Sequence, residues 1–341
     1  MIGLRRKSLK RKLLIVSAIF LPLLLLVFSL SLGTYAISLN KVLNVILAKL
    51  TGLQSALLSG PEANIILNIR LPRLLLALLA GAAFSVSGAS LQSLFRNPLV
   101  NEYILGVSFG AGFGAAASLV LLSRTFPPQL LAFACGLLAV VLVLLVSEGA
   151  RNTMIAVLLT GIIVSALFQA LLSAIEFMAS PYALQSLFFW LLGSFSQATW
   201  SDLMWSAPLI VVGLGLLLNL GWRLNVLSLS DDEARSLGLA VKRERILIIC
   251  LATLITSAVV AIAGIIGWVG LIVPHAVRGL VGSDNRLVLP LSAGFGAGLM
   301  LLADDLIRIF SPYEFPVGIL TNLVGIPFFL YLIKKSRANW S

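Results

Sequence analysis

Long apolar runs separated by short polar stretches dominate this sequence of 341 residues. A helix that crosses a membrane needs about 20 apolar residues in succession, because the hydrocarbon layer is about 30 Å thick and each residue advances the helix by about 1.5 Å. By this measure the pattern predicts ten spans, of which the eighth is short for a complete crossing: 13–36, 63–94, 98–123, 130–147, 153–175, 202–221, 246–266, 268–281, 287–307 and 316–333. A further apolar piece, at 187–195, is shorter still and fits a re-entrant segment packed within protein.

These spans predict an all-α polytopic membrane protein with about ten transmembrane helices. The composition agrees, because 60% of the residues are hydrophobic and only 11% are charged, whereas soluble domains carry about 25% charged residues. A transmembrane β-barrel would instead show short segments of alternating apolar and polar residues. We expect a tail at 1–12, a single transmembrane domain at 13–335 and a second tail at 336–341. The first apolar run exceeds the roughly 7–15 residues of a secretory signal core, so it is expected to be a retained span.

The distribution of basic residues predicts the orientation of the chain. The first twelve residues carry six Lys and Arg and no acid, and Lys334, Lys335 and Arg337 lie in the last predicted turn and tail. Because Lys and Arg accumulate on the cytoplasmic side, and an even number of spans returns the chain to the side where it began, both termini are expected to be cytoplasmic. The net charge of +11 then reflects topology and not a nucleic-acid partner. The basic residues left on the other side are Lys41, Lys49, Arg70, Arg73, Arg124 and Arg308.

One hydrophilic segment, at 222–245, separates the sixth and seventh spans. Within it Ser230 predicts a helix N-cap, the acidic residues at 231–233 fill the first turn, and Gly238 ends the helix. A short helix of mixed charge on the cytoplasmic face is either a solvated loop or a docking element for a soluble partner. The segment by itself favours neither.

Two aspartates at the end of the ninth span predict an ion pair. Asp304 and Asp305 precede Arg308 by four and three residues, so both can face it on one helix. Acids within a membrane are costly and therefore informative, but these lie far along the span, near its outer end. The position favours an outer-surface ion pair over a proton relay.

The remaining candidate chemistry is sparse. The sequence contains neither a phosphate-binding GxxxxGK[ST] pattern nor an HExxH pattern, and nothing in it assembles a nucleophile with a base. The single histidine, His275, favours a structural role over a haem or iron ligand. Cys135 and Cys250 lie in apolar segments without CxxC spacing, so they are expected to be buried, unpaired and free of metal.

A weak internal echo connects two predicted spans. Arg96 follows Gly88 by eight residues, and Arg278 follows Gly270 by the same distance. If the two segments run in opposite directions, the echo indicates an inverted repeat of the kind found in many transporters.

Three stretches of the chain resemble the permease subunits of type II ABC importers, the FecCD/BtuC-like family that takes up ferric siderophores, haem and vitamin B12. The stretches are RLPRLLLALLAGAAFSVSGASLQSLFRNPLVNEYILGVSFGAGFGAA, GLIVPHAVRGLVGSDNRLVLPLSAGFGAGLMLLADDLIR and PYEFPVGILTNLVGIPFFLYLI, and the resemblance extends in order over about 13–335. It implies a multi-pass protein of the prokaryotic inner membrane that forms a homodimer of ten-helix subunits, with the transport path along the dimer axis. It also implies two cytoplasmic ATPase subunits, which bind ATP and Mg while this chain carries no cofactor, and a periplasmic or lipid-anchored substrate-binding protein.

The resemblance also assigns roles to residues. Arg70, Arg73 and Arg308 match positions that form outward pockets for acidic residues of the binding protein, and guanidinium groups suit this role because they bind carboxylates in a bidentate manner. Around Asn152, Thr153 and Met154 the chain resembles the family's cytoplasmic gate. The segment inserted into the ATPase, the coupling helix, corresponds to Ser230, Asp231, Asp232, Glu233, Ala234, Arg235, Ser236, Leu237, Gly238 and Leu239.

The expected function is therefore that of a transport subunit and not of an enzyme. ATP-driven alternating access would move a metal chelate across the membrane, and haem, ferric siderophores, cobalamin and even an oxyanion remain open as cargo. The alternative is an ion-coupled secondary transporter that works without an ATPase and uses Asp304, Asp305 or Glu176. A membrane enzyme or scaffold is the third class, and it lacks a catalytic constellation.

Overall fold

A computed structural model describes residues 2–52, 58, 60–122, 125–148, 154–310 and 315–337. Over these residues the chain is helical, with short turns and no strand. Its main elements are α1 (Ile2–Ser31), α2 (Leu39–Thr51), α3 (Pro61–Asn64), η2 (Ile65–Arg70), α4 (Leu71–Leu94), η3 (Glu102–Leu105), α5 (Val107–Ala116), η4 (Ala117–Leu121), α6 (Pro128–Glu148), α7 (Met154–Met178), α8 (Pro181–Leu191), α9 (Trp200–Asn219), α10 (Gly221–Leu227), α11 (Asp231–Ser236), α12 (Val241–Ala263), α13 (Val269–Val281), α14 (Asn285–Phe310) and α15 (Val317–Arg337).

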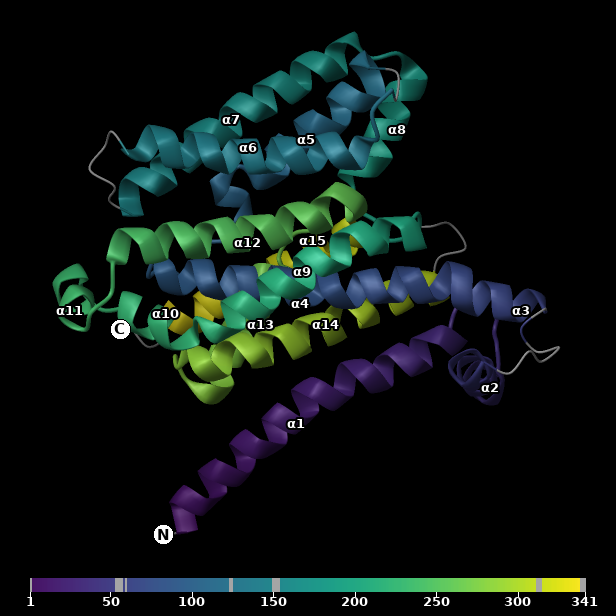
Figure 1. The fold of residues 1–341 in the computed structure, drawn as a ribbon, viewed down its shortest axis with the longest axis horizontal. Helices are drawn as coiled ribbons and strands as arrows, with labels where there is room; N and C mark the ends of the chain where they lie inside the picture. The colour runs from purple at the N-terminus through teal and green to yellow at the C-terminus, as the bar shows by residue number, and fades with distance from the viewer. Residues whose placement is uncertain are drawn as a thin grey trace.

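The helices confirm the predicted spans. Seven helical stretches among the described residues are long and apolar enough to cross a membrane, and three shorter apolar helices, at Val107–Leu121, Val269–Val281 and Val317–Leu330, occupy the places of the third, eighth and tenth predicted spans. The apolar piece at 187–195 forms the second half of α8 and the turn that follows it. Most of the helices run along the long axis of the molecule, as Figure 1 shows.

The core of the bundle is α4. It packs against α14, α12, α13 and α9, and 83% of the most apolar stretch in Pro61–Leu94 is buried, against 22% for the span in α1. Small residues allow this packing, because helices in lipid approach closely only where side chains are short. A Cβ added to Gly81 would overlap the carbonyl oxygen of Gly296, and a Cβ added to Gly88 would overlap that of Gly270.

The segments that share the glycine–arginine echo run side by side in the same direction. Gly88 lies against Gly270, and Arg278 donates to the Ala89 carbonyl and the Ser93 hydroxyl, each at 2.9 Å, so both segments advance toward the same end of the bundle. The pair is therefore parallel and not inverted. A shared need for close backbone contact explains the two glycines better than a repeat does.

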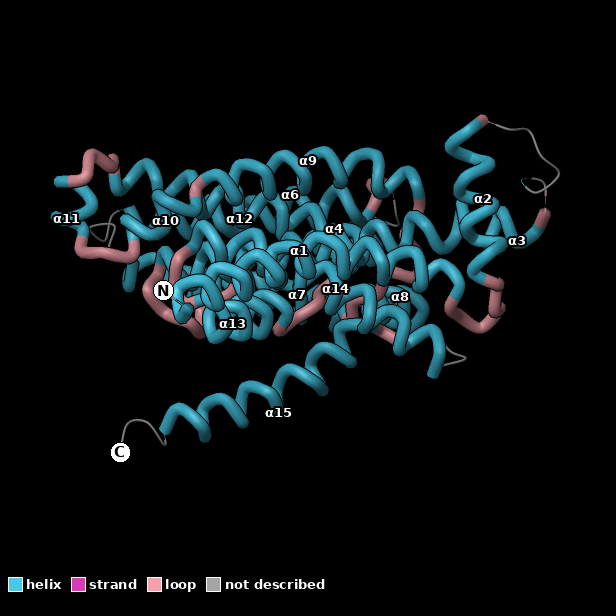
Figure 2. Tube along the Cα trace, turned by 90° about the horizontal axis from the view of Figure 1, so that it is seen from below, coloured by secondary structure: helices cyan, strands magenta, loops and turns pink. Residues whose placement is uncertain are grey.

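The two ends of the bundle carry different elements. The short helix α11, the start of α1 and the end of α15 lie toward one end, and α2 and α3 lie at the other (Figures 1 and 2). The sequence reading left the α2 region as a connection, but it forms a 13-residue helix whose buried residues are Val42, Val45 and Ala48. The α1 helix diverges from the bundle in Figure 1 and α15 does so in Figure 2, which leaves large apolar faces uncovered in the single chain.

Candidate functional site

The short helix predicted in the hydrophilic segment is confirmed as α11, together with both of its caps. The Ser230 hydroxyl accepts a hydrogen bond from the Glu233 backbone N–H, while the Glu233 carboxylate accepts one from the Ser230 backbone N–H at 2.9 Å. This reciprocal capping box satisfies two N–H groups that a helix start leaves unpaired. At the other end Gly238 has φ +85°, and Leu239 N–H reaches back to the Ala234 carbonyl, which closes the helix in a Schellman motif.

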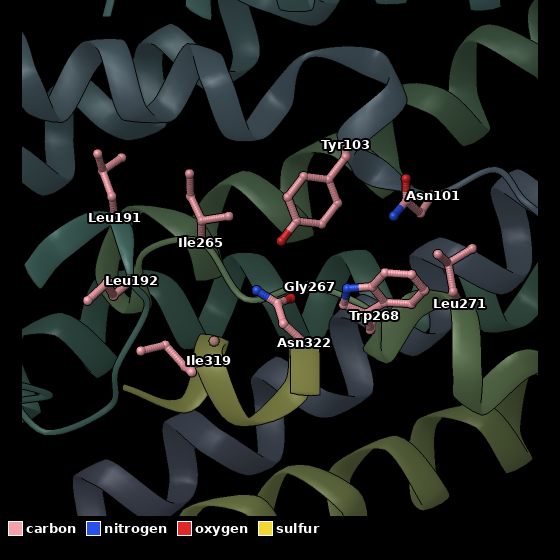
Figure 3. Close-up of a pocket in the computed structure, with 11 residues that line it drawn as sticks. Asn101, Tyr103, Leu191, Leu192, Ile265, Gly267, Trp268, Leu271, Ile319 and Asn322 are labelled. Atoms are coloured by element: carbon pink, nitrogen blue, oxygen red, sulfur yellow. The ribbon is translucent and has the colours of Figure 1, made fainter. Parts of the chain in front are cut away.

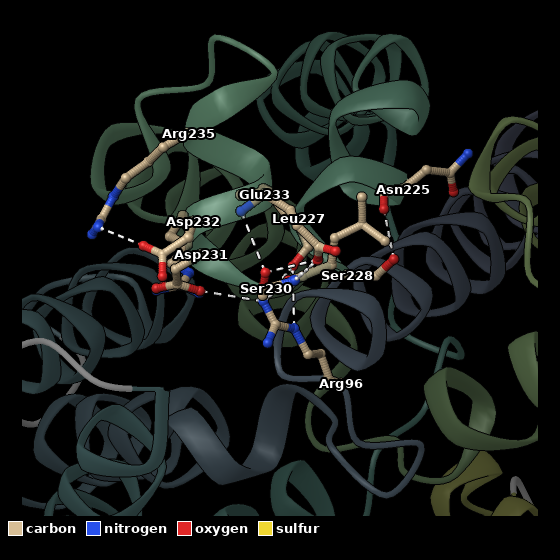
Figure 4. Close-up of polar contacts among 11 residues, drawn as sticks. Arg96, Asn225, Leu227, Ser228, Ser230, Asp231, Asp232, Glu233 and Arg235 are labelled. Atoms are coloured by element: carbon tan, nitrogen blue, oxygen red, sulfur yellow. Dashed lines mark hydrogen bonds and ion pairs between the residues drawn. The ribbon is translucent and has the colours of Figure 1, made fainter.

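Two arginines from other helices brace the start of α11, as Figure 4 shows for Arg96. Arg245 on α12 binds the Asp231 carboxylate through two nitrogens, at 2.6 and 3.0 Å. Arg96, just beyond α4, donates to the carbonyls of Leu227 and Leu229 and contacts Asp231 at 3.3 Å. The hydrogen bonds from Arg245 hold the pKa of Asp231 below its usual range although partial burial acts to raise it. The helix is therefore fixed to the bundle in one position.

This bracing divides the acidic first turn into residues that hold the bundle or the cap and one residue, Asp232, whose carboxylate pairs only loosely with Arg235 of the same helix, at 3.4 Å. Asp231 binds arginines and Glu233 serves the cap, so neither is available to a partner. In contrast, the Asp232 and Arg235 side chains are 94% and 66% exposed, and Leu237 is also exposed. The outward face of α11 thus offers one acid, one base and one apolar residue that contribute little to the fold.

A polar turn between α13 and α14 supports the same end of the molecule. The Asn225 amide donates to Asp284 at 2.7 Å and accepts from the Asn285 backbone N–H at 2.7 Å. Ser93, at the end of α4, donates to Asn285 at 2.8 Å. Sequence reasoning missed these residues and the two bracing arginines, because their partners are distant in the chain.

At the opposite end, a buried cluster of charges joins α4 to α14. Arg73 and Asp304 form an ion pair at 2.9 Å, and Arg308 contacts the same aspartate at 3.0 Å. Arg308 also binds Asp305, so the i, i+3 and i, i+4 contacts expected from the sequence are both present. Asp305 in turn accepts a hydrogen bond from Ser29 on α1. The cluster connects three helices.

The arginines at this end also hold the end of α1. Arg70 donates to the Leu30 carbonyl at 2.7 Å, Arg308 donates to the Leu32 carbonyl at 2.9 Å, and each makes a second bond to a carbonyl within 29–35. The last carbonyls of a helix lack partners inside it, so cations are well placed to satisfy them.

In the single chain, the three arginines that the resemblance matched to binding-protein pockets are largely buried. Arg70 and Arg73 are 6% and 8% exposed, and the Arg308 side chain is 9% exposed. All three direct their guanidinium groups toward buried aspartates or toward 29–35. The physical reason is that a buried carboxylate without a counter-charge is costly, and the arginines supply that charge.

Of the three residues matched to the gate, Asn152 and Thr153 lie outside the described residues. Met154 is the first residue of α7. It lines a cavity of about 420 Å³ together with residues of α6, α11 and α12, among them Asp231 and Arg245. Met154 and the braced helix α11 therefore border one cavity.

The described residues contain no group of three or more His, Cys, Asp or Glu that could hold a metal ion. His275 lies against the ring of Phe329, with centroids 6.2 Å apart. Cys135 is half-buried and Cys250 is exposed, so the expected burial of Cys250 is wrong. A helix that faces lipid can expose an apolar residue without cost, which explains the difference.

Comparisons with known proteins agree on one family. The model of the FecCD transport family matches residues 21–335. The molybdate import permease MolB of Haemophilus influenzae is 38% identical and covers 91% of this chain and 92% of its own length. The hemin transport permease HmuU of Yersinia pestis is also 38% identical, with 82% and 85% covered. A metal-chelate type ABC transporter in an inward-facing conformation superposes with a TM-score of 0.82 at 35% identity, covering 94% of this chain and 98% of that one.

Proposed function

Because this chain belongs to the FecCD transport family, we propose that it is the permease subunit of an ATP-driven importer for a metal chelate such as a ferric siderophore, haem or cobalamin. The observation that carries this proposal is α11. A helix of six residues with both ends capped and two arginines fixing its first residue presents Asp232, Arg235 and Leu237 outward. A rigid, exposed knob of this kind suits a soluble motor subunit. Molybdate stays open as cargo because MolB, a relative at 38% identity, is named for it.

In this proposal two copies of the chain form a homodimer in a prokaryotic inner membrane, with both termini and α11 in the cytoplasm. Two ATPase subunits bind ATP and Mg and seat α11 in a cleft. Closure of the ATPases moves α11, and the dimer opens alternately to the two sides. No covalent bond of the cargo is made or broken, so the permease contributes only the change in conformation that moves the cargo.

At the opposite end we place the binding protein over Arg70, Arg73 and Arg308. The support is their convergence, since residues from η2, α4 and α14 meet beside the end of α1 and the turn that follows it, at 29–35. An acidic side chain that docks here would compete with the aspartates and carbonyls that the arginines already hold. Docking would therefore act on this turn as well as on the arginines.

The structure lends little support to the ion-coupled alternative. Asp304 and Asp305 contact arginines within 3.0 Å or less, so neither is a free acid poised to carry a proton. An ion-coupled transporter would move cargo in vesicles that contain only this chain and an ion gradient. We expect no transport of cargo in such vesicles.

A mild-detergent purification of the tagged chain from its host tests the proposal. We expect an ATPase with a phosphate-binding loop to be recovered in equal amount. Charge reversal at Arg235, written Arg235→Glu, should reduce ATPase recovery about tenfold, because it changes an exposed docking residue. The matched control is Arg243→Glu, an exposed arginine in the first turn of α12. Recovery of the folded chain alone, in repeated purifications, would contradict the proposal.

A further inference from the structure

A cavity of about 340 Å³ lies between η3, the end of α8, and the starts of α13 and α15. Four polar or aromatic side chains, those of Asn101, Tyr103, Trp268 and Asn322, line one part of it. Aliphatic side chains line the rest: Figure 3 shows Leu191, Leu192, Ile265 and Ile319 on the opposite side from Asn101 and Trp268, while Leu271 lies beside Trp268. The cavity is thus amphipathic, and no acidic or basic residue is among its lining residues.

The backbone around this cavity is not helical, although it lies deep in the bundle. The turn at 264–268 separates α12 from α13, and α13 has 13 residues, so the turn lies about 20 Å from the end that carries α11. That is about half the length of α14, which has 26 residues and extends about 39 Å. Irregular backbone at membrane depth occurs where it is buried in protein or lines a water-filled cavity.

Two of the polar side chains, those of Tyr103 and Asn322, approach one point beside Gly267. A Cβ added to Gly267 would lie 3.1 Å from the Tyr103 hydroxyl and 3.2 Å from the Asn322 amide oxygen. In the described chain the side chains of Asn101, Tyr103, Trp268 and Asn322 make no hydrogen bond. Asn101 is largely buried, whereas Asn322 is exposed in the single chain. Their hydrogen-bonding groups are therefore not used by the described chain and are available to a ligand that enters the cavity.

Backbone strain marks the same cavity. Trp268 has φ +70°, a left-handed conformation that is unfavourable for a bulky aromatic residue. Its ring packs closely on Gly325 of α15 and lies 5.9 Å from the ring of Phe329. Such strain persists only where the surroundings impose it, and it concentrates at functional sites.

We propose that this cavity is a binding subsite on the transport path for the anionic oxygen atoms of the cargo, whether carboxylates of a metal chelate or a free oxyanion. The amides, phenol and indole supply neutral hydrogen-bond donors, and the N-terminal ends of α13 and α15 add partial positive charge. The nearest acid in sequence, Glu102, packs against Gly270 and does not line the cavity. Neutral donors bind an anion without the tight hold of a buried cation, which suits a site that must also release its ligand.

This inference rests on the proposed function, and thiol labelling in native membranes tests it separately. In the protein used for labelling, C135A and C250A remove both natural cysteines, and Asn322→Cys then introduces a single thiol at the cavity. The matched control is Leu323→Cys, which is the next residue, 63% exposed, and not part of the cavity lining. We expect a charged, water-soluble thiol reagent to modify Asn322→Cys about tenfold faster than the control, because only thiolate in contact with water reacts.

Millimolar molybdate and millimolar ferric citrate are the probes. We expect at least one of them to slow the labelling of Asn322→Cys but not that of Leu323→Cys. Protection by molybdate alone indicates an oxyanion subsite, and protection by ferric citrate alone indicates a chelate carboxylate subsite. When Tyr103→Phe is added to the Asn322→Cys protein, the probe concentration that gives half-maximal protection should rise about three- to tenfold, since one hydrogen bond to the probe is lost. Tyr182→Phe, which alters a residue that is 84% exposed and outside the lining, should leave it unchanged.

Failure to label Asn322→Cys, or labelling that neither probe slows, overturns the subsite. The labelling is done whether or not an ATPase accompanies the chain. Absence of the ATPase therefore counts against the proposed function alone, while absence of protection counts against the subsite alone.

Discussion

Asp304 illustrates how much one residue can hold in a membrane protein. Its carboxylate is fully buried and shared between Arg73 and Arg308. The spacing along α14 predicts the contact with Arg308, because residues four apart on a helix face one another. Nothing local predicts the contact with Arg73, which lies 231 positions away. Sequence reasoning thus found one partner of two, because the contact with Arg73 appears only in three dimensions.

Replacing this aspartate should be strongly destabilising. We expect Asp304→Asn to lower the free energy of unfolding by about 3–5 kcal/mol, because it leaves two buried arginines without their shared counter-charge. Asp232→Asn, at a side chain that is 94% exposed, should change it by less than about 0.5 kcal/mol. Thermal unfolding in mild detergent, followed by size-exclusion chromatography, measures both. Equal unfolding temperatures for the two variants would contradict the structural role of the cluster.

At the scale of elements, apolar length predicted the spans well, because a membrane crossing demands a continuous apolar helix. The pattern could not place α2, because its apolar stripe is short and its two lysines are typical of a connecting loop. It did separate the short eighth span, at 268–281, from the seventh, but it could not show that the break between them borders a cavity, because a cavity forms between elements that are distant in the sequence. For α11 the local caps sufficed to define the helix, but the residues that brace it come from α4 and α12 and are found only in three dimensions.

The contact between α4 and α14 can be tested with two glycines of one helix. We expect Gly296→Ala to disrupt packing, since the added methyl group would overlap the Ser85 hydroxyl and the Gly81 carbonyl; overpacking of this kind costs about 1–3 kcal/mol or more. Gly298→Ala is the control, because its added methyl meets only side-chain atoms, at 3.6 Å or beyond. Unfolding temperature and the yield of monodisperse protein report the difference. Similar values for both variants would show that the helices are not in close contact there.

At the scale of the whole molecule, the two ends of the bundle should face opposite sides of the membrane. Leu50, on α2, and Leu237, beside α11, are 78% and 52% exposed and mark these ends. In sealed right-side-out vesicles of a chain with C135A and C250A, we expect an impermeant thiol reagent to label Leu50→Cys. Leu237→Cys should be labelled only after permeabilisation. Labelling of both from one side would contradict the proposed topology.

The most buried helix of the molecule also connects its two ends. Arg70 and Arg73 stand where α4 begins, and Arg96 follows its end and holds the segment that leads into α11. Between them α4 runs for 24 residues, about 36 Å, with close-packed neighbours along most of its length. A packed helix neither shortens nor bends easily, so it acts as a strut. A small tilt at one end of α4 must displace the other end. Under the proposed function, docking of a binding protein on the outer side would therefore be transmitted to the ATPase side mechanically, through the tilt of one rigid helix.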